Sequence, residues 1–165
     1  MNYILSFDIG TTNAKAVLTD MSGNVVDHYS EPMTVYYPEP RCVEQKPDDW
    51  WRAVTVASSR VMEKTAVNPG DICGIVFSSQ AMSVTLVDHQ GEPLTPASMI
   101  WMDNRAGQEA KLLMRRFGGP KIFEKLLGAK LTGNYLLPKH YWYKRNMPDL
   151  YQRTRAFLDQ GAYLC

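Results

Sequence analysis

A short polar stretch near the amino terminus combines residue types that bind phosphate groups and a divalent cation. It contains one acid, one glycine, two threonines, an asparagine and a lysine: Asp8, Gly10, Thr11, Thr12, Asn13 and Lys15. The apolar runs on either side, 3–5 and 16–18, have the composition of short strands, so the sequence predicts a β-hairpin that turns at Gly10. Such a turn directs backbone N–H groups and hydroxyls into one space, which suits phosphate oxygens.

Asp8 and Lys15 would complete this site from the two sides of the turn. A carboxylate at Asp8 can hold Mg²⁺ directly or through water, and the ammonium of Lys15 can neutralise phosphate charge. The alternative is an ordinary hairpin in which the acid and the hydroxyls only cap the turn. The convergence of these residue types favours the phosphate site.

Two further polar clusters follow predicted strands, and ligands of α/β proteins gather where strands end. The side chains concerned are Gln80, Met82, Trp101, Asp103 and Arg105. Amide, carboxylate and guanidinium groups offer both donors and acceptors, which suits a polyhydroxylated ligand, and Trp101 offers a flat wall. The alternatives are a turn role for Gln80, and for Asp103 and Arg105 a surface pair or a helix cap.

The elements that must position these clusters alternate between strands and helices. The hairpin leads into a predicted strand over 25–29 and a proline-rich connection over 31–49, expected at the surface. Pro47 suits the start of a helix. The buried stripe of that helix repeats at helical spacing and comprises Trp50, Val54, Ala57 and Val61.

The second half of the chain continues the alternation. The unbroken apolar run 72–77 predicts a strand buried on both faces, and 84–87 predicts another strand. Helices are expected after Arg105, over 122–127 and from Pro138, followed by a last short strand near 155–158. This pattern predicts an α/β fold with a mixed sheet and flanking helices.

The composition excludes several classes of protein. The 165 residues are 45% hydrophobic and 21% charged with a net charge of +1, so no nucleic-acid partner is expected. Three cysteines without a C-x-x-C pair indicate free thiols in a reducing compartment, and we expect a cytoplasmic protein. No leader and no apolar run long enough for a membrane span is visible, so no membrane partner is expected. P-loop and hydrolase-elbow motifs are absent.

The chain resembles the FGGY carbohydrate kinases over its whole length. Residues 7–15 resemble the family's first phosphate loop, and 43–51 resemble its E-Q-x-P and W-W segment. Residues 74–82 resemble the strand and loop that meet the sugar. The P-x-I-x-W-x-D-x-R stretch corresponds to 94–105 and the K-x-x-W helix to 139–142. The resemblance implies a ribonuclease H-like domain of the actin/hexokinase ATPase type.

The resemblance also implies an activity: phosphoryl transfer from ATP, with Mg²⁺, to a hydroxyl of a small sugar or polyol. By position, the phosphate groups and the metal would be bound by Asp8, Gly10, Thr11, Thr12, Asn13 and Lys15, with Asp8 as the metal ligand. The implied sugar contacts are Gln80, Ala81, Met82, Trp101, Asp103 and Arg105. Positioning and charge stabilisation would carry the reaction, with domain closure excluding water.

Several features of the sequence depart from the family pattern. Xylulokinases usually have Met-His-Gly where this chain has Ala81-Met82-Ser83. Gluconate and L-xylulose kinases resemble this chain more closely at these positions, so the identity of the sugar stays open. Family members are much longer. Residues 1–165 are therefore expected to be a partial N-terminal sugar-binding domain, with the ATP-binding domain and the general-base aspartate downstream and no catalytic base within the chain.

The lone chain is accordingly expected to turn over negligibly. One rival hypothesis is a non-catalytic sugar-binding or interaction module of the same fold. Another is a different actin-like ATPase, against which the segment 101–105 and the Gln80 loop count. A homodimer is a further possibility.

Overall fold

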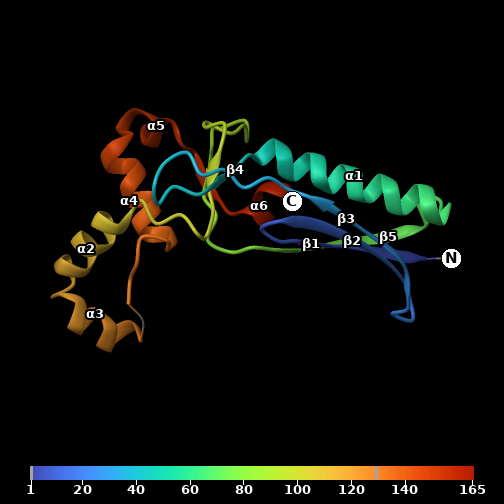
Figure 1. Ribbon diagram of the computed structural model, residues 1–165, viewed down its shortest axis with the longest axis horizontal. Helices are drawn as coiled ribbons and strands as arrows, with labels where there is room; N and C mark the ends of the chain where they lie inside the picture. Colours follow the sequence, from blue (N-terminus) through green and yellow to red (C-terminus); the bar gives the residue numbers. More distant parts are fainter. Residues whose placement is uncertain (1, 129) are drawn as a thin grey trace. The chain divides into compact units, whose positions relative to one another are not determined.

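The structure is a computed structural model that describes residues 2–128 and 130–165 (Figure 1). The chain forms two compact units. The first contains the residues up to Val35 together with Lys46–Gln80 and Leu164–Cys165. The second contains Tyr36–Gln45 and Ala81–Tyr163. Each unit is described by itself.

A four-stranded mixed sheet forms the first unit, in the order β3-β2-β1-β5. Strands β1 (Tyr3–Ile9), β2 (Asn13–Asp20) and β3 (Val25–Pro32) make an antiparallel meander. Strand β5 (Ile72–Ser79) pairs with β1 in parallel. The predicted hairpin and third strand are therefore confirmed.

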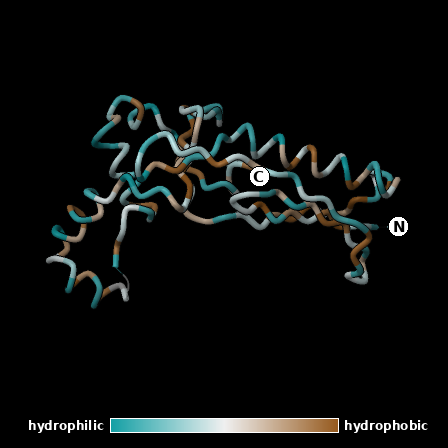
Figure 2. The backbone as a smooth tube through the Cα atoms, in the orientation of Figure 1, coloured by the Kyte–Doolittle hydropathy of each residue, from teal (hydrophilic) through white to brown (hydrophobic). Residues whose placement is uncertain are grey.

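Helix α1 (Pro47–Thr65) covers one face of this sheet (Figure 1). Pro47 lies in its first turn with two acids beside it, which suits the positive end of the helix dipole. The predicted stripe is confirmed, because Trp50, Val54, Ala57 and Val61 are all buried. Figure 2 shows apolar and polar positions alternating along α1. A short 3₁₀ turn, η1 (Pro69–Asp71), follows and leads into β5.

Strand β5 corrects one prediction. The run 72–77 was expected to be buried on both faces, yet Ile75 is 59% exposed and Val76 is 55% exposed. The cause is topological: β5 is an edge strand, and α1 packs against β2 and β3. An apolar run alone does not distinguish a central strand from an edge strand.

In the second unit, part of the proline-rich connection is buried, which corrects the expected surface placement of 31–49. Strand β4 (Glu44–Gln45) pairs antiparallel with β7 (Ser98–Met99). Cys42, Val43 and Gln45 are buried. The expectation failed because the partner strand lies more than fifty residues further along the chain.

The rest of the second unit is a β-ribbon with helices. Strand β6 (Thr85–Val87) pairs with β8 (Ala156–Leu158), which confirms the two short strands expected near these positions. The helices are α2 (Gly107–Arg116), α3 (Pro120–Leu127), α4 (Leu136–Asn146) and α5 (Pro148–Arg153). Helix α6 (Gln160–Leu164) begins in this unit, and its last residue belongs to the first unit. Two apolar clusters hold these elements: one contains Leu86, Met99 and Tyr143, the other Met114 and Phe123.

Across residues 2–128 and 130–165, no helix has both the length and the apolar character that crossing a bilayer requires.

Candidate phosphate and sugar sites

The hairpin of the first unit presents an acid and a cation side by side. Asp8 and Lys15 are directly opposite each other in the β1–β2 ladder, and both are exposed. Residues opposite each other in a ladder point to the same face. Their neighbours Ile9 and Ala14 are fully buried on the other face. Asp8 and Lys15 therefore project from the face of the hairpin that lies opposite α1.

The turn between them is held by backbone bonds and leaves polar groups at the surface. Gly10 N donates to Asn13 O at 3.0 Å. The exposed amide of Asn13 donates to Thr12 Oγ1 at 2.9 Å. This arrangement keeps the predicted phosphate residues in one hairpin.

Gln80 lies against this same turn. Its backbone N–H donates to Ile9 O at 3.0 Å, and its side-chain Oε1 accepts from Thr11 Oγ1 at 3.2 Å. From the sequence, Gln80 was grouped with the candidate polyol contacts. In the structure it is the one residue of that group that belongs to the unit of the phosphate hairpin. The others, Ala81, Met82, Trp101, Asp103 and Arg105, belong to the second unit.

Asp103 is fully buried, so the hypothesis of a surface pair is wrong. Its carboxylate accepts from Val43 N at 2.8 Å and from Arg105 Nε and Nη2 at 2.9 and 2.7 Å. Arg105 Nη2 also donates to Glu44 Oε1 at 2.5 Å. The result is a carboxylate–guanidinium–carboxylate chain inside the second unit.

The electrostatics of this chain keep Arg105 charged. Burial by itself would lower the pKa of Arg105, but the hydrogen bonds and charges of Asp103 and Glu44 outweigh burial and raise it. The guanidinium also lies 5.4 Å from the centre of the Trp142 ring, within the range of a cation–π contact. Arg105 is therefore fixed in place by three neighbours.

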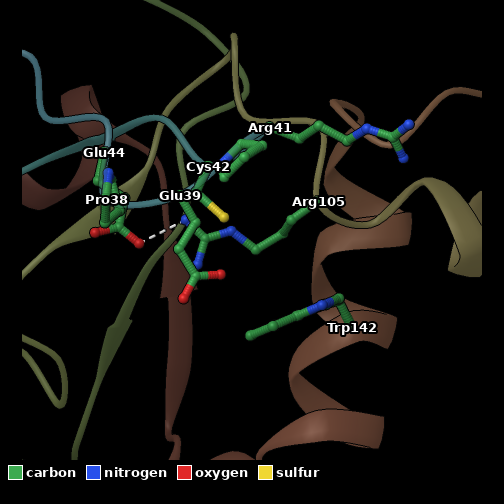
Figure 3. A pocket seen from close by; sticks show the side chains of 8 residues that line it. Pro38, Glu39, Arg41, Cys42, Glu44, Arg105 and Trp142 are labelled. Atoms are coloured by element: carbon green, nitrogen blue, oxygen red, sulfur yellow. Dashed lines mark hydrogen bonds and ion pairs between the residues drawn. The ribbon is translucent and has the colours of Figure 1, made fainter.

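An open hollow surrounds the outer side of Arg105 (Figure 3). Its volume of about 490 Å³ is in the range of small-molecule sites. The lining residues are Pro38, Glu39, Pro40, Arg41, Cys42, Glu44, Arg105 and Trp142. Carboxylates, guanidinium groups and an indole give this hollow the mixture of donors, acceptors and flat apolar surface that a polyol needs. Burial raises the pKa of the Cys42 thiol, which favours its protonated form.

Glu44 and Trp142 are among the lining residues to which no role was assigned from the sequence. They lie in segments that carry the family resemblance, which is the signal that could have singled them out. Trp101, expected as the flat wall, is 44% exposed and does not line this hollow.

Asp8 is the carboxylate predicted from the sequence to hold a divalent cation. Within residues 2–128 and 130–165, no group of three or more His, Cys, Asp or Glu side chains converges to form a metal site. A single carboxylate suffices for Mg²⁺ when phosphate oxygens and water supply the remaining ligands. The exposed Asp8 beside Lys15 fits that role.

The fold is that of sugar kinases related to the actin/hexokinase ATPases. The crystal structure of a xyloylose kinase from Brucella ovis superposes with a TM-score of 0.89 at 29% identity, covering 99% of this chain and 33% of that one. The gluconate kinase of Lactobacillus acidophilus shares the fold, with a TM-score of 0.87 at 24% identity over 99% of this chain and 32% of its own.

The sequence comparisons agree. The xylulose kinase of Staphylococcus xylosus is 30% identical over 164 residues, which are 99% of this chain and 33% of that protein. The family profile described as "FGGY family of carbohydrate kinases, N-terminal domain" matches residues 3–165. The chain belongs to this family. It spans about a third of the length of the curated relatives it matches.

Proposed function

We propose that this chain is the part of an ATP-dependent carbohydrate kinase that carries the phosphate hairpin and a set of sugar contacts. The observation that carries the proposal is the pairing of Asp8 with Lys15 on one exposed face, at a turn that Gln80 contacts. Membership of the FGGY family supplies the reaction class. When bound, ATP would supply the phosphoryl group and Mg²⁺ would neutralise its charge.

The residues of this chain would bind and orient the reactants. Lys15 would attract the phosphate oxygens, Asp8 would hold the cation, and the N–H and hydroxyl groups of Gly10, Thr11, Thr12 and Asn13 would surround the phosphate. The proposed sugar contacts are Gln80, Ala81, Met82, Trp101, Asp103 and Arg105. Because the Asp103 carboxylate is already bound by Arg105 and Val43, its part would be to orient Arg105.

The sugar is a proposal at the level of a class: a ketopentose or a sugar acid. Relatives named xylulose kinase support the first, and a fold neighbour named gluconate kinase supports the second. The residues Ala81-Met82-Ser83 are the place where the two would be discriminated. The general base is expected outside residues 1–165, and so is the adenosine site.

Nucleotide binding gives the first test. We expect MgADP to shift the amide resonances of residues 8–15 in the isotope-labelled chain, and Asp8→Asn and Lys15→Gln to weaken that binding about tenfold or more each. Asp149→Asn, an exposed acid on α5, is the matched control and should leave binding unchanged. Equal binding by all variants would overturn the phosphate assignment.

Turnover and sugar binding separate the remaining hypotheses. A coupled ADP-release assay with ketopentoses and sugar acids should give negligible turnover for the 165-residue chain. Robust turnover would refute the partial-domain proposal. Sugar binding by calorimetry that is indifferent to MgADP would favour the non-catalytic module.

A further inference from the structure

Lys139 is a fully buried lysine whose only hydrogen-bond acceptors in the described structure are two backbone carbonyls. It lies on α4, with no exposed surface. Its Nζ donates to Met82 O and to Ile100 O, both at 2.7 Å. The two carbonyls come from segments that are eighteen positions apart, which Lys139 joins through one atom.

Both segments carry candidate sugar contacts. Met82 is itself one, and it holds a left-handed backbone conformation with φ of 64°, which is unfavourable for a side chain of this kind. Ile100 directly precedes Trp101, and its carbonyl also accepts from Asp103 N at 3.0 Å. The lysine therefore fixes a strained residue on one side and the start of the 101–105 turn on the other.

The surroundings explain why a lysine is suited to this place. The part-buried bond to Met82 O and the buried bond to Ile100 O need two N–H donors on a long, thin side chain, and even a neutral amine has two. Burial lowers the pKa of Lys139 to about 8, while the charge of Asp103 acts in the opposite direction and that of Arg105 adds to the lowering. His140, the next residue on α4, has its own pKa lowered by burial and by Lys139.

We propose that Lys139 is a positioning residue for the sugar site: it ties the Met82 segment to the Ile100 segment and so sets the geometry of the contacts on both. That the positioned residues bind a sugar rests on the proposed function above. The link that Lys139 makes between the two segments, called the tie below, does not depend on the proposed function. Lys139 does not touch the reacting atoms in this assignment and acts through the two carbonyls.

Amide hydrogen exchange tests the tie without any ligand. Lys139→Met keeps the length and loses the donors, and Lys144→Met, on the same helix at an exposed position, is the matched control. We expect exchange at residues 82–84 and 100–103 to rise about tenfold or more in Lys139→Met. Lys139→Arg, which keeps N–H donors, should restore part of the protection.

The pattern of exchange separates positioning from general stability. A residue that only supports the fold would raise exchange throughout the second unit, including β6 and β8, and that result would overturn the proposal. Unchanged exchange at both segments would overturn it as well.

Sugar affinity gives the second readout. If the wild-type chain binds a sugar in calorimetry, Lys139→Met should weaken that binding about tenfold or more at a temperature where the variant is fully folded, while Lys144→Met leaves it unchanged. Undiminished affinity in Lys139→Met would contradict the positioning role. If the wild-type chain binds no sugar, the proposed function fails, and hydrogen exchange still decides whether the tie exists.

Discussion

The hydroxyl of Thr11 donates a hydrogen bond to the side-chain oxygen of Gln80 at 3.2 Å, although the two residues are 69 positions apart. The parallel pairing of β1 with β5 produces this contact, because Ile9 and Ser79 are the last partners of that ladder. The end of β5 thereby reaches the turn of the phosphate hairpin. A candidate sugar contact is thereby hydrogen-bonded to the candidate phosphate loop.

Removing the hydroxyl of Thr11 tests this hydrogen bond. Thr11→Val keeps the shape and loses the donor, so we expect the free energy of unfolding to fall by about 0.5–1.5 kcal/mol. Thr12→Val is the control, because Thr12 is exposed and its hydroxyl, within residues 2–128 and 130–165, bonds to its neighbour Asn13 alone. Urea unfolding of both variants measures the difference. Equal losses would mean that the bond between Thr11 and Gln80 contributes nothing specific.

The core under α1 offers a matched pair of tryptophans. Trp50 has no exposed surface, whereas Trp51 is 46% exposed. Trp50→Ala should lower the free energy of unfolding by about 3–5 kcal/mol, because it leaves a cavity on the buried side of α1. Trp51→Ala should cost less than about 1 kcal/mol. Thermal or denaturant unfolding checks both, and a similar cost for the two would contradict the assignment of the buried stripe.

The hairpin and α1 could be predicted from the sequence because their signals are local. In β2 the buried residues Ala14, Ala16 and Leu18 recur at every second position, and the stripe of α1 recurs at helical spacing. Pro47 marks the start of the helix in the sequence. Such patterns need no knowledge of distant partners.

The incorrect predictions concern residues whose burial depends on partners that are distant in the sequence. Glu44 pairs with Met99 and Gln45 with Ser98, and nothing in a proline-rich stretch indicates that a later strand will bury it. The same holds for Asp103 and Arg105, whose spacing is compatible with an exposed pair. Their burial depends on Val43 and Glu44, some sixty residues earlier.

The carboxylate of Asp103 should be difficult to replace. Asp103→Asn removes a buried charge that faces Arg105 and receives Val43 N, which leaves the guanidinium partly uncompensated. We expect the free energy of unfolding to fall by about 3–5 kcal/mol. Asp149→Asn, at an exposed position of α5, should change it by less than about 0.5 kcal/mol. Denaturant titrations of the two variants measure this difference in the free energy of unfolding. A small loss in Asp103→Asn would mean that Glu44 alone compensates the charge of Arg105.

The buried amine of Lys139 should make stability depend on alkaline pH. Its pKa is lowered from 10.5 to about 8, so between these values the unfolded chain binds more protons than the folded one. The free energy of unfolding therefore rises with pH across this window, by up to roughly 3 kcal/mol. Below and above the window, the contribution of Lys139 does not change with pH.

Subtracting the pH profile of Lys139→Met from that of the wild type isolates this contribution. The subtraction removes the titration of residues that both proteins share, including Tyr143, whose pKa burial raises. Any effect on His140, whose pKa burial lowers, falls outside the alkaline window. We expect the difference to grow as the pH rises from 8 towards 10.5. A difference that stays constant over this range would show that the amine titrates as it does in water, and hence that Lys139 is not enclosed between Met82 and Ile100.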